Sequence, residues 1–377
     1  MKPRFLSGLS HAEFLRQHWQ KKPLLARAAL RDYAGAITRG ELFHLAGRDA
    51  VDSRIITRTR GRWQVHNGPF SRHDMKRLPA SGWTLLVQGV DSLLPQAARL
   101  LQEFSFIPYA RLDDVMVSYA APGGGVGPHF DSYDVFLIQG AGKRRWQVSS
   151  QSDLELAPGV PLKILGRFTP QDEWLLEPGD LLYLPPHWAH DGVAVGECMT
   201  YSIGFRAPGA QELGERFLEF LQDRLQLDGA YSDPDLEPAR RPGRIPSAML
   251  ARTSEVLNEL RWSRSTVVEF LGCYLTEPKP QVVFAHPRRP AAREQFEQRV
   301  RKYGVRLSAK TRMLFHGQHV FINGEALRPG AGAARTLTAL ADARSLPKSA
   351  RLNTEVWQVL YDWYRAGYIE SSSKPLS

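Results

Sequence analysis

The chain has 377 residues, of which 43 % are hydrophobic and 23 % charged, and it carries a formal net charge of +10. This length exceeds what one hydrophobic core usually serves, so two or three domains are expected, and the composition is that of a globular protein rather than a disordered or fibrous one. No apolar run approaches the roughly 20 residues that span a bilayer, and no apolar segment follows the basic start, which argues against a membrane span and a signal peptide.

The chain has two cysteines, Cys198 and Cys273, and their spacing fits neither a disulfide framework nor a zinc finger. A reducing compartment is therefore expected, and we predict a cytoplasmic protein. The positive surplus favours a polyanionic partner. Proteins of an arginine-rich proteome can carry a positive net charge without binding such a partner. The net charge alone therefore does not decide whether the protein binds nucleic acid directly.

The first part of the chain predicts a mixed α and β region that becomes a β-rich domain. Residues 14–19 read as a short amphipathic helix that ends before Pro23, and residues 83–90 read as a strand. From residue 115 to residue 205, short apolar strands alternate with glycine and proline turns; the clearest strands are 115–119, 135–138 and 181–184. Such spacing predicts a sandwich or barrel, of which the jelly roll is one form, over residues 1–208.

Helical patterns dominate residues 209–276. Apolar residues recur at helical spacing in 212–227 and again in 247–274, with a proline-rich, charged linker at 233–246 between them. Their apolar faces must be buried. The residues alone leave two options, packing on the β-rich domain or pairing with a second copy of the chain.

The last segment, residues 277–377, combines helices with one hairpin. A basic helix is expected at 291–303 and a strand–turn–strand at 313–324, followed by two more helices. This arrangement predicts a small winged-helix-like domain. A wing is not in itself evidence of DNA binding, because function resides in a site rather than in a fold.

The first chemical signal is His129-Phe130-Asp131, which follows a glycine-rich loop. Residues two apart on a strand point to the same face, so His129 and Asp131 can offer a nitrogen and an oxygen to one metal ion. By itself a His-x-Asp pair is weak evidence.

A second signal strengthens the first. The turn at 177–180 leads into the strand 181–184, and His187 and His190 follow shortly after it. Either histidine could complete a set of two histidines and one carboxylate with His129 and Asp131. That set leaves three positions open on an octahedral metal, which suits Fe(II) that must bind a bidentate co-substrate and oxygen.

The third signal lies in residues 140–148. The glycines are expected to turn a hairpin, whose returning strand carries Arg144 and Trp146 on one face and Arg145 on the other. An arginine inside the barrel could pair with the remote carboxylate of 2-oxoglutarate through its planar fork. The alternative is a solvated basic hairpin.

Together these residues resemble a known family, the JmjC-type 2-oxoglutarate oxygenases. Within it the chain is most similar to the bacterial ribosomal oxygenases, which hydroxylate an arginine in the sixteenth protein of the large ribosomal subunit. The segments that carry the resemblance are 122–131, 133–140, 143–146, 177–190 and 201–208. The layout of β-domain, helical region and winged-helix-like tail matches as well, so the resemblance covers most of the chain.

The resemblance implies a mainly β fold with added helices. It comprises a double-stranded β-helix (jelly-roll, cupin-like JmjC) barrel, a helical dimerisation region and a winged-helix-like C-terminal domain. The expected cofactors are Fe(II), 2-oxoglutarate and O2, and the expected partners are a ribosomal protein substrate and a second copy of the chain. No catalytic side chain is implied beyond the metal centre.

The resemblance also assigns residues. His129, Asp131 and His190 correspond to the iron ligands, and Arg144 and Ser118 to the residues that hold 2-oxoglutarate. The chain departs from its relatives at His187, where they usually carry a residue that cannot bind metal, which makes His187 a rival of His190. Thr200 stands where relatives can carry a larger polar residue, which leaves the co-substrate contacts there open.

Other functions remain compatible with the sequence. The same chemistry could act on a histidine or lysine of another protein, since the metal site does not specify the substrate. A cupin of another reaction type would usually need a fourth protein ligand, and a non-enzymatic regulator would need no intact triad. For an arginine substrate, the candidate partners of the guanidinium are Asp113, Asp114, Tyr133 and Asp134.

Overall fold

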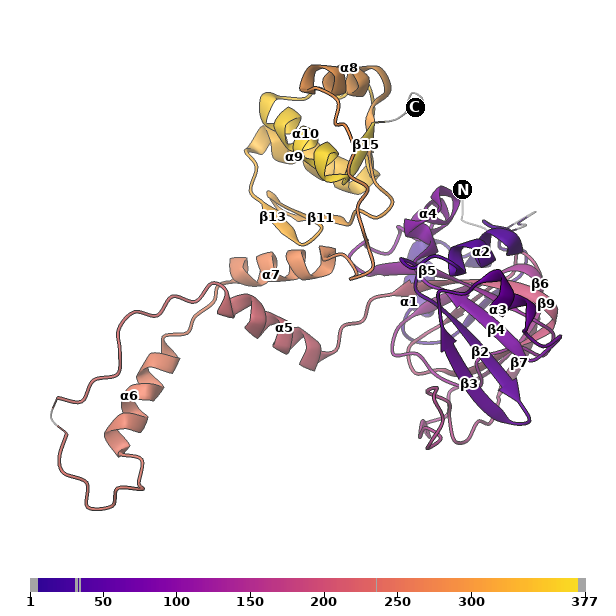
Figure 1. Cartoon of the computed structure of the whole chain (residues 1–377), viewed down its shortest axis with the longest axis horizontal. Helices are drawn as coiled ribbons and strands as arrows, with labels where there is room; N and C mark the ends of the chain where they lie inside the picture. The colour runs from indigo at the N-terminus through magenta and orange to yellow at the C-terminus, as the bar shows by residue number, and fades with distance from the viewer. Residues whose placement is uncertain (1–5, 31–32, 34, 235, 372–377) are drawn as a thin grey trace. The chain divides into compact units, whose positions relative to one another are not determined.

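The computed structural model describes residues 6–30, 33, 35–234 and 236–371 (Figure 1). The chain divides into two compact units. The first unit comprises residues 1–207, 278–311 and 343–377, and the second comprises residues 208–277 and 312–342. None of the helices within the described ranges combines the length and the apolarity that crossing a bilayer requires.

A mixed set of short helices and nine strands builds the β-domain of the first unit. The helical elements are α1 (His11–Gln17), α2 (Arg39–Ala46), α3 (Arg72–Lys76), η2 (Val90–Ser92) and α4 (Pro95–Gln102). The strands are β1 (Leu24–Ala26), β2 (Ser53–Thr59), β3 (Arg62–Asn67), β4 (Trp83–Val87), β5 (Leu112–Ala120), β6 (Val135–Ser149), β7 (Asp172–Leu176), β8 (Leu181–Leu184) and β9 (Ala189–Phe205). The helix expected near residue 14 and the strands expected at 83, 115, 135 and 181 are thus confirmed.

Strands β6 and β9 define the architecture, because they pair with each other along both of their halves. The first half of β6 also pairs with β8, and its second half pairs with β7. The strand order is β1-β8-β6-β9-β5-β4-β2-β3, with β7 on β6, and this order is an open path. The two layers are therefore a cupin-like β-sandwich joined through two bent strands, which confirms the expected jelly-roll type of fold, although the sheet does not close into a complete barrel.

The bend in β6 replaces the hairpin that the sequence predicted at residues 140–148. The β6–β9 register shifts between Gln139 and Ala141 and again between Ala141 and Lys143, so the strand kinks but continues in the same direction. Gly142 has φ +61°, and a Cβ there would collide with the carbonyl oxygen of Glu197. Only glycine fits such a position. The hairpin prediction was wrong, whereas the placement of Arg144 and Trp146 on one face, opposite Arg145, is confirmed.

One layer of the sandwich contains β8, the first half of β6, β5 and β4, and its two faces have different roles. Its outer face packs under the N-terminal helices, where Phe14 of α1 contacts Tyr183 and Phe136 with ring centroids 5.0 and 5.4 Å apart. The inner face lies between the layers and holds a smaller apolar cluster: Val135, Leu137, Trp146, Val148, Leu176, Leu182 and Leu184. Burial of this cluster removes apolar area from water and lines the space where the polar site residues project.

The first unit also contains two segments of the C-terminal region, residues 278–311 and 343–377. Their helices and strands are α8 (Arg293–Tyr303), β10 (Val305–Leu307), β14 (Ser345–Leu346), α10 (Thr354–Ala366) and β15 (Ile369–Ser371). Strand β10 pairs with β14 on one side and β15 on the other. The basic helix expected at 291–303 is confirmed as α8.

The second unit contains α5 (Ala210–Gln222), α6 (Ser247–Asn258), α7 (Arg264–Thr276), β11 (Met313–His316), β12 (His319–Ile322), β13 (Glu325–Leu327) and most of α9 (Ala331–Ala343). The expected strand–turn–strand is β11–β12. The single helical stretch expected at 247–274 is two helices, because Ser263 caps α7 with its hydroxyl and interrupts the run.

Candidate metal and co-substrate site

His129 and His190 lie opposite each other where the loop after β5 meets the start of β9. An isolated antiparallel bridge joins them, with His129 N donating to His190 O at 2.9 Å and His190 N donating to His129 O at 2.7 Å. Directly opposite residues of such a bridge point to the same side. The glycine-rich loop 123–127 therefore brings His129 to a position set by the backbone of β9.

The side chains of His129, Asp131 and His190 converge on one point. One potential ligand atom from each lies within 4.8 Å of the others, and His190 Nε2 is 3.7 Å from Asp131 Oδ2. In both histidines, Nδ1 lies 2.8 Å from the carbonyl oxygen two residues earlier, that of Gly127 and that of Trp188. A carbonyl can only accept, so Nδ1 carries the proton in each ring and Nε2 is left with its lone pair toward the centre.

The buried position of His190 favours its neutral form. Its side chain is 3 % exposed, and burial, followed by the proximity of His129, lowers the pKa of His190 from 6.5 to about 4. A neutral imidazole is the form that binds a metal ion.

His187, the rival expected from the sequence, does not join the cluster. It is exposed, has φ 64°, and places its ring 5.7 Å from that of Phe130. Its backbone N–H donates to the carbonyl oxygen of Asp131 at 2.7 Å. The residue therefore contributes a main-chain bond that fixes the loop carrying Asp131, while its imidazole lies outside the group of convergent ligands.

Arg144 and Ser118, which the family resemblance assigns to the co-substrate, are brought together on the inner face. They are 5 % and 2 % exposed, and Arg144 Nη1 donates to Ser118 Oγ at 3.4 Å. The Nε and Nη2 atoms of Arg144 are buried without a hydrogen-bond partner. A guanidinium with two unsatisfied donors costs several kcal/mol to bury, so this position calls for an anion such as a carboxylate.

Trp146 lies between the metal-ligand residues and the co-substrate residues. The sequence predicted only the face of the strand on which it lies. Its indole centroid lies 5.7 Å from the Arg144 guanidinium and 5.9 Å from the His190 ring. Gly192 pairs with Trp146 across β6 and β9, and a Cβ at Gly192 would lie 2.7 Å from the indole. The glycine therefore makes room for the indole between the arginine and the histidine.

Gln139 was missed from the sequence because its role depends on the bend in β6. Its fully buried amide donates to the carbonyl oxygens of Ala141 and Gly142, at 2.8 and 3.3 Å, and accepts from the hydroxyl of Thr200 at 3.1 Å. These bonds satisfy groups that the register shifts leave out of the ladder. The Thr200 side chain is thus engaged by Gln139. The main-chain carbonyl oxygen of Thr200 accepts a hydrogen bond from the Ser118 hydroxyl at 3.4 Å.

Asp134, one of the four candidates for a substrate guanidinium, is inaccessible. It is 0 % exposed and accepts hydrogen bonds from Tyr183 Oη at 2.6 Å and from Gln20 Nε2 at 3.0 Å, with Arg111 3.3 Å away. A substrate side chain cannot reach it. Its role is to join β6, β8 and the N-terminal segment.

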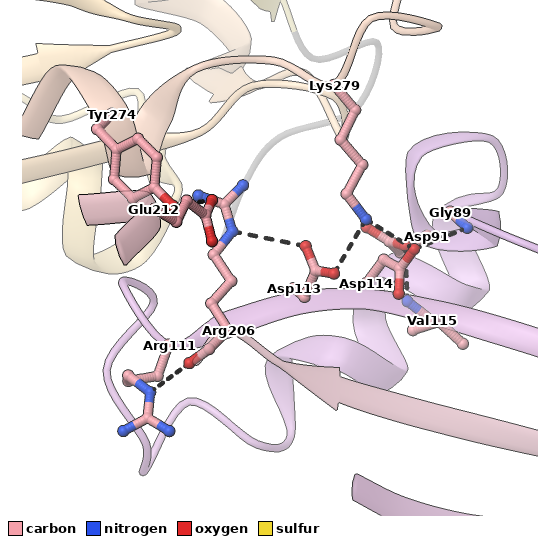
Figure 2. A network of polar contacts seen from close by, with 10 residues as sticks. All are labelled: Gly89, Asp91, Arg111, Asp113, Asp114, Val115, Arg206, Glu212, Tyr274 and Lys279. Carbon is pink, nitrogen blue, oxygen red and sulfur yellow. Dashed lines mark hydrogen bonds and ion pairs between the residues drawn. The ribbon is translucent and has the colours of Figure 1, made fainter. Parts of the chain in front are cut away.

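Asp113 and Asp114 are engaged by side chains of the chain itself (Figure 2). They lie at a bulge in β5, which lets two successive carboxylates reach the ammonium of Lys279, at 3.1 and 3.0 Å. Arg206 adds a second cation, 3.5 Å from Asp113. Burial alone would lower the pKa of Lys279, but the two carboxylates outweigh it and raise that pKa. An incoming guanidinium would have to displace an ammonium that is already paired.

Tyr133 remains the accessible candidate of the four. Its side chain is 39 % exposed. The packing around its hydroxyl and the nearby carboxylates of Asp131, Asp114 and Asp113 raise the pKa of Tyr133, so it stays a neutral phenol that can donate a hydrogen bond.

The residues present fit Fe(II) and 2-oxoglutarate. Two imidazoles and one carboxylate converge from the loop after β5 and the start of β9, and this is the donor set of non-haem Fe(II) oxygenases. The buried, unsatisfied guanidinium of Arg144 offers the matching site for a dicarboxylate.

Comparisons with known proteins agree with this geometry. A JmjC domain model matches residues 99–213 and a ROXA-like winged helix model matches residues 259–370. The ribosomal protein uL16 3-hydroxylase of Escherichia coli is 35 % identical over 320 residues, covering 84 % of this chain and 85 % of that protein. A probable ribosomal oxygenase of Haemophilus influenzae is 39 % identical over 229 residues, 59 % of this chain and 54 % of that protein.

A solved structure shows the same fold over nearly the whole chain. The ribosomal oxygenase of Escherichia coli in complex with cobalt and 2-oxoglutarate superposes with a TM-score of 0.81 and 32 % identity, covering 96 % of this chain and 98 % of that one. The convergent triad, the buried arginine and these similarities lead to one conclusion: the chain belongs to the ribosomal oxygenase family of JmjC-domain 2-oxoglutarate-dependent dioxygenases.

Proposed function

We propose that this chain hydroxylates an arginine side chain of uL16, the sixteenth protein of the large ribosomal subunit, with Fe(II), 2-oxoglutarate and O2. The proposal rests on two features that occur together in the site. One is the buried guanidinium of Arg144, which has unsatisfied donors, and the other is the convergent triad of His129, Asp131 and His190. The substrate is suggested by the Escherichia coli relative, whose name specifies uL16 and hydroxylation at position 3.

The residues divide the work of holding the two cofactors. Nε2 of His129, a carboxylate oxygen of Asp131 and Nε2 of His190 would hold Fe(II), with each imidazole oriented by its main-chain carbonyl. Arg144 and Ser118 would hold the remote carboxylate of 2-oxoglutarate. When bound, the metal and co-substrate supply the oxidising chemistry that activates O2 and transfers one oxygen atom to a C–H bond.

The protein contributes position and exclusion of water. The inner apolar cluster lines the site, and Trp146 fills the space between Arg144 and His190. Substrate enters from the side where Tyr133 is exposed, and the phenol can donate to a polar group of the substrate peptide. No side-chain acid or base is needed in this assignment.

The test is mass spectrometry of recombinant uL16 incubated with the protein, Fe(II), 2-oxoglutarate and ascorbate. We expect a gain of one oxygen atom on one arginine-containing peptide, absent with the Asp131→Ala variant and absent when that arginine is replaced by lysine. If the oxygen is found on a histidine or lysine, the chemistry stands and the substrate assignment is wrong. If iron and 2-oxoglutarate bind but no succinate forms, the oxygenase assignment is wrong as well.

We also propose that the chain forms a homodimer through its helical region. Helix α6 has no buried residue, and Leu250 and Leu257 on it are 65 % and 58 % exposed. Trp262, just beyond it, is 57 % exposed. Large apolar side chains gathered in this way usually mark an interaction surface. Because its proposed substrate is a ribosomal protein, we place the protein in the cytoplasm.

Sedimentation analysis tests the dimer with two matched variants. Leu250→Asp should shift the protein from dimer to monomer, because it puts a charge into the apolar surface. Leu236→Asp should leave the dimer intact, because Leu236 is equally exposed, at 64 %, but lies outside the helices. A monomeric parent protein, or equal effects of both variants, would contradict the proposal.

A further inference from the structure

The positive charge of this protein is concentrated in its C-terminal region. Residues 278–377 contain 17 lysines and arginines against 7 acidic residues, which equals the whole surplus of +10. Residues 1–277 contain 32 basic and 32 acidic residues. A general drift of composition toward arginine would raise the charge along the whole chain. The observed segregation instead indicates that one region is selected to be basic.

The structure shows which of these cations are available. The carboxylate of Glu297 is shared by Arg293 and Arg301, at 3.2 and 3.0 Å, and Glu370 is paired with Arg306 at 2.8 Å. Seven further side chains of the first unit's C-terminal part are exposed and form no ion pair with any described carboxylate: Arg288, Arg289, Arg299, Lys302, Lys348, Arg351 and Arg365. We call these the basic surface.

Helices α8 and α10 arrange the basic surface. They pack antiparallel, since Ala291, two residues before α8, hydrogen-bonds Tyr361 and Tyr364 late in α10, at 3.1 and 3.2 Å. Near the other end, the Arg301 guanidinium lies 5.0 Å from the centroid of Trp357, early in α10.

Each end of the helix pair therefore carries its own cations. Arg288 and Arg289 precede α8, and the carbonyl oxygen of Arg365 lies 3.1 Å from Nδ1 of His286, which places Arg365 at the same end. Lys302 lies in the last turn of α8, and Lys348 and Arg351 precede α10, so these three cations lie at the opposite end. Arg299 lies between the ends on the exposed side of α8. Because α8 has 11 residues, cations extend over about 16 Å, which matches several phosphates of a nucleic acid backbone.

We propose that the basic surface binds the phosphate backbone of RNA. Five of its seven cations are arginines, whose planar forks pair bidentately with phosphate and are more weakly hydrated than an ammonium. The choice of RNA over an acidic protein rests on the proposed function, because a ribosomal protein substrate is surrounded by ribosomal RNA. Residues 1–277, in which basic and acidic residues are equal in number, would then carry out the chemistry. The basic surface would retain the enzyme on ribosomal particles.

The test uses the full-length protein and a fluorescently labelled RNA hairpin of about 20 base pairs, followed by anisotropy at increasing KCl. Binding should weaken linearly in a plot of log affinity against log salt, with a slope of about −0.9 for each phosphate contact. The double variant Arg288→Glu/Arg289→Glu should lower the affinity about tenfold or more at low salt and make the slope shallower by about two contacts.

The chain provides a matched control in Arg240 and Arg241. Both tripeptides read Arg-Arg-Pro, both arginine pairs are exposed, and reversing either pair changes the net charge equally, but Arg240 and Arg241 lie within residues 1–277. Arg240→Glu/Arg241→Glu should leave RNA affinity unchanged. Equal losses in both double variants, or no binding at about 50 mM KCl, would overturn the proposal. A polyglutamate peptide that competes as well as unlabelled RNA would also overturn it, in favour of an acidic protein partner.

A second readout separates this proposal from the proposed function. Hydroxylation of isolated uL16 needs no RNA, so the Arg288→Glu/Arg289→Glu variant should retain its rate on the free protein. If RNA binds as described but uL16 is not modified, the substrate assignment fails and the basic surface stands. If uL16 is modified but RNA does not bind, only the basic surface is refuted.

Discussion

The main chains of His129 and His190 exchange two hydrogen bonds, and their rings lie 4.2 Å apart between centroids. The distance between these two imidazoles is therefore set by backbone pairing rather than by loop length. A slip of one residue in the pairing would place Ala189 opposite His129 and turn His190 to the other face.

Two histidine variants test the ligand assignment. His190→Ala should lower succinate formation by more than about 100-fold, because only two protein ligands remain for the metal. His187→Ala should keep most of the activity, since its imidazole is exposed and only its backbone N–H bonds Asp131. Steady-state assays and a metal titration of each variant provide the measurement. Equal losses in the two variants would show that His187 also binds the metal.

Arg144 and Arg145 form a second pair for comparison, buried and exposed neighbours on one strand. Arg144→Lys keeps the charge but loses the planar fork, so the KM for 2-oxoglutarate should rise by about 10-fold or more. The KM for uL16 should change little. Arg145→Lys should leave both constants as they are. A rise confined to the KM for uL16 would assign Arg144 to the protein substrate instead.

Two glycine-to-alanine substitutions should have opposite effects on stability. Gly192→Ala pushes a methyl group into the indole of Trp146 and should destabilise the protein by about 1–3 kcal/mol, with loss of activity. Gly214→Ala, in the middle of α5 with nothing within 4 Å, should stabilise the helix by about 0.5–1 kcal/mol. Urea unfolding of both variants decides this. A neutral Gly192→Ala would mean that the indole can move freely.

The metal-free protein should lose stability in mild acid. Unfolded His190 takes up a proton near its ordinary pKa of 6.5, whereas the folded residue, buried and close to His129, does so only at about 4. Folding is therefore fully favoured by this residue above pH 6.5 and becomes less favourable as the pH falls toward 4, by up to about 3 kcal/mol. Unfolding with chelator at about pH 7 and about pH 5 measures the change. His190→Gln should flatten the dependence, and an unchanged slope in that variant would show that another group causes the acid sensitivity.

The sequence identified those parts of the fold that local patterns determine. Strand β8 was predicted at its observed bounds, because an apolar tetrapeptide between a glycine turn and a proline pair is a strong local signal. The alternation that buries Arg144 and exposes Arg145 is equally local. The triad was predicted from its spacing and family resemblance, and the structure brings His190 rather than His187 beside His129 and Asp131, because the bridge to His129 distinguishes the two histidines.

Other features depend on contacts that are distant in the sequence. Gly140 and Gly142 fit a hairpin and a bulge equally well, and pairing with β9, some 50 residues later, decides for the bulge. The sequence offered Asp134 as a candidate partner of a substrate guanidinium, whereas in the structure its carboxylate accepts hydrogen bonds from Tyr183 and Gln20. The segregation of charge could be counted from the sequence, but which cations lack a carboxylate required the structure.

The two imidazole N–H groups that donate to Gly127 O and Trp188 O have a consequence for the evolution of this site. Many metal-binding histidines are oriented by a carboxylate side chain, which a single nucleotide change can remove. In this protein the orienting acceptors belong to the polypeptide main chain, and they persist whatever side chains replace Trp188 or the neighbours of Gly127. The orientation of the two histidine rings is thus insensitive to substitution of these neighbouring side chains. Distant descendants can therefore differ widely in sequence around the metal site without losing it.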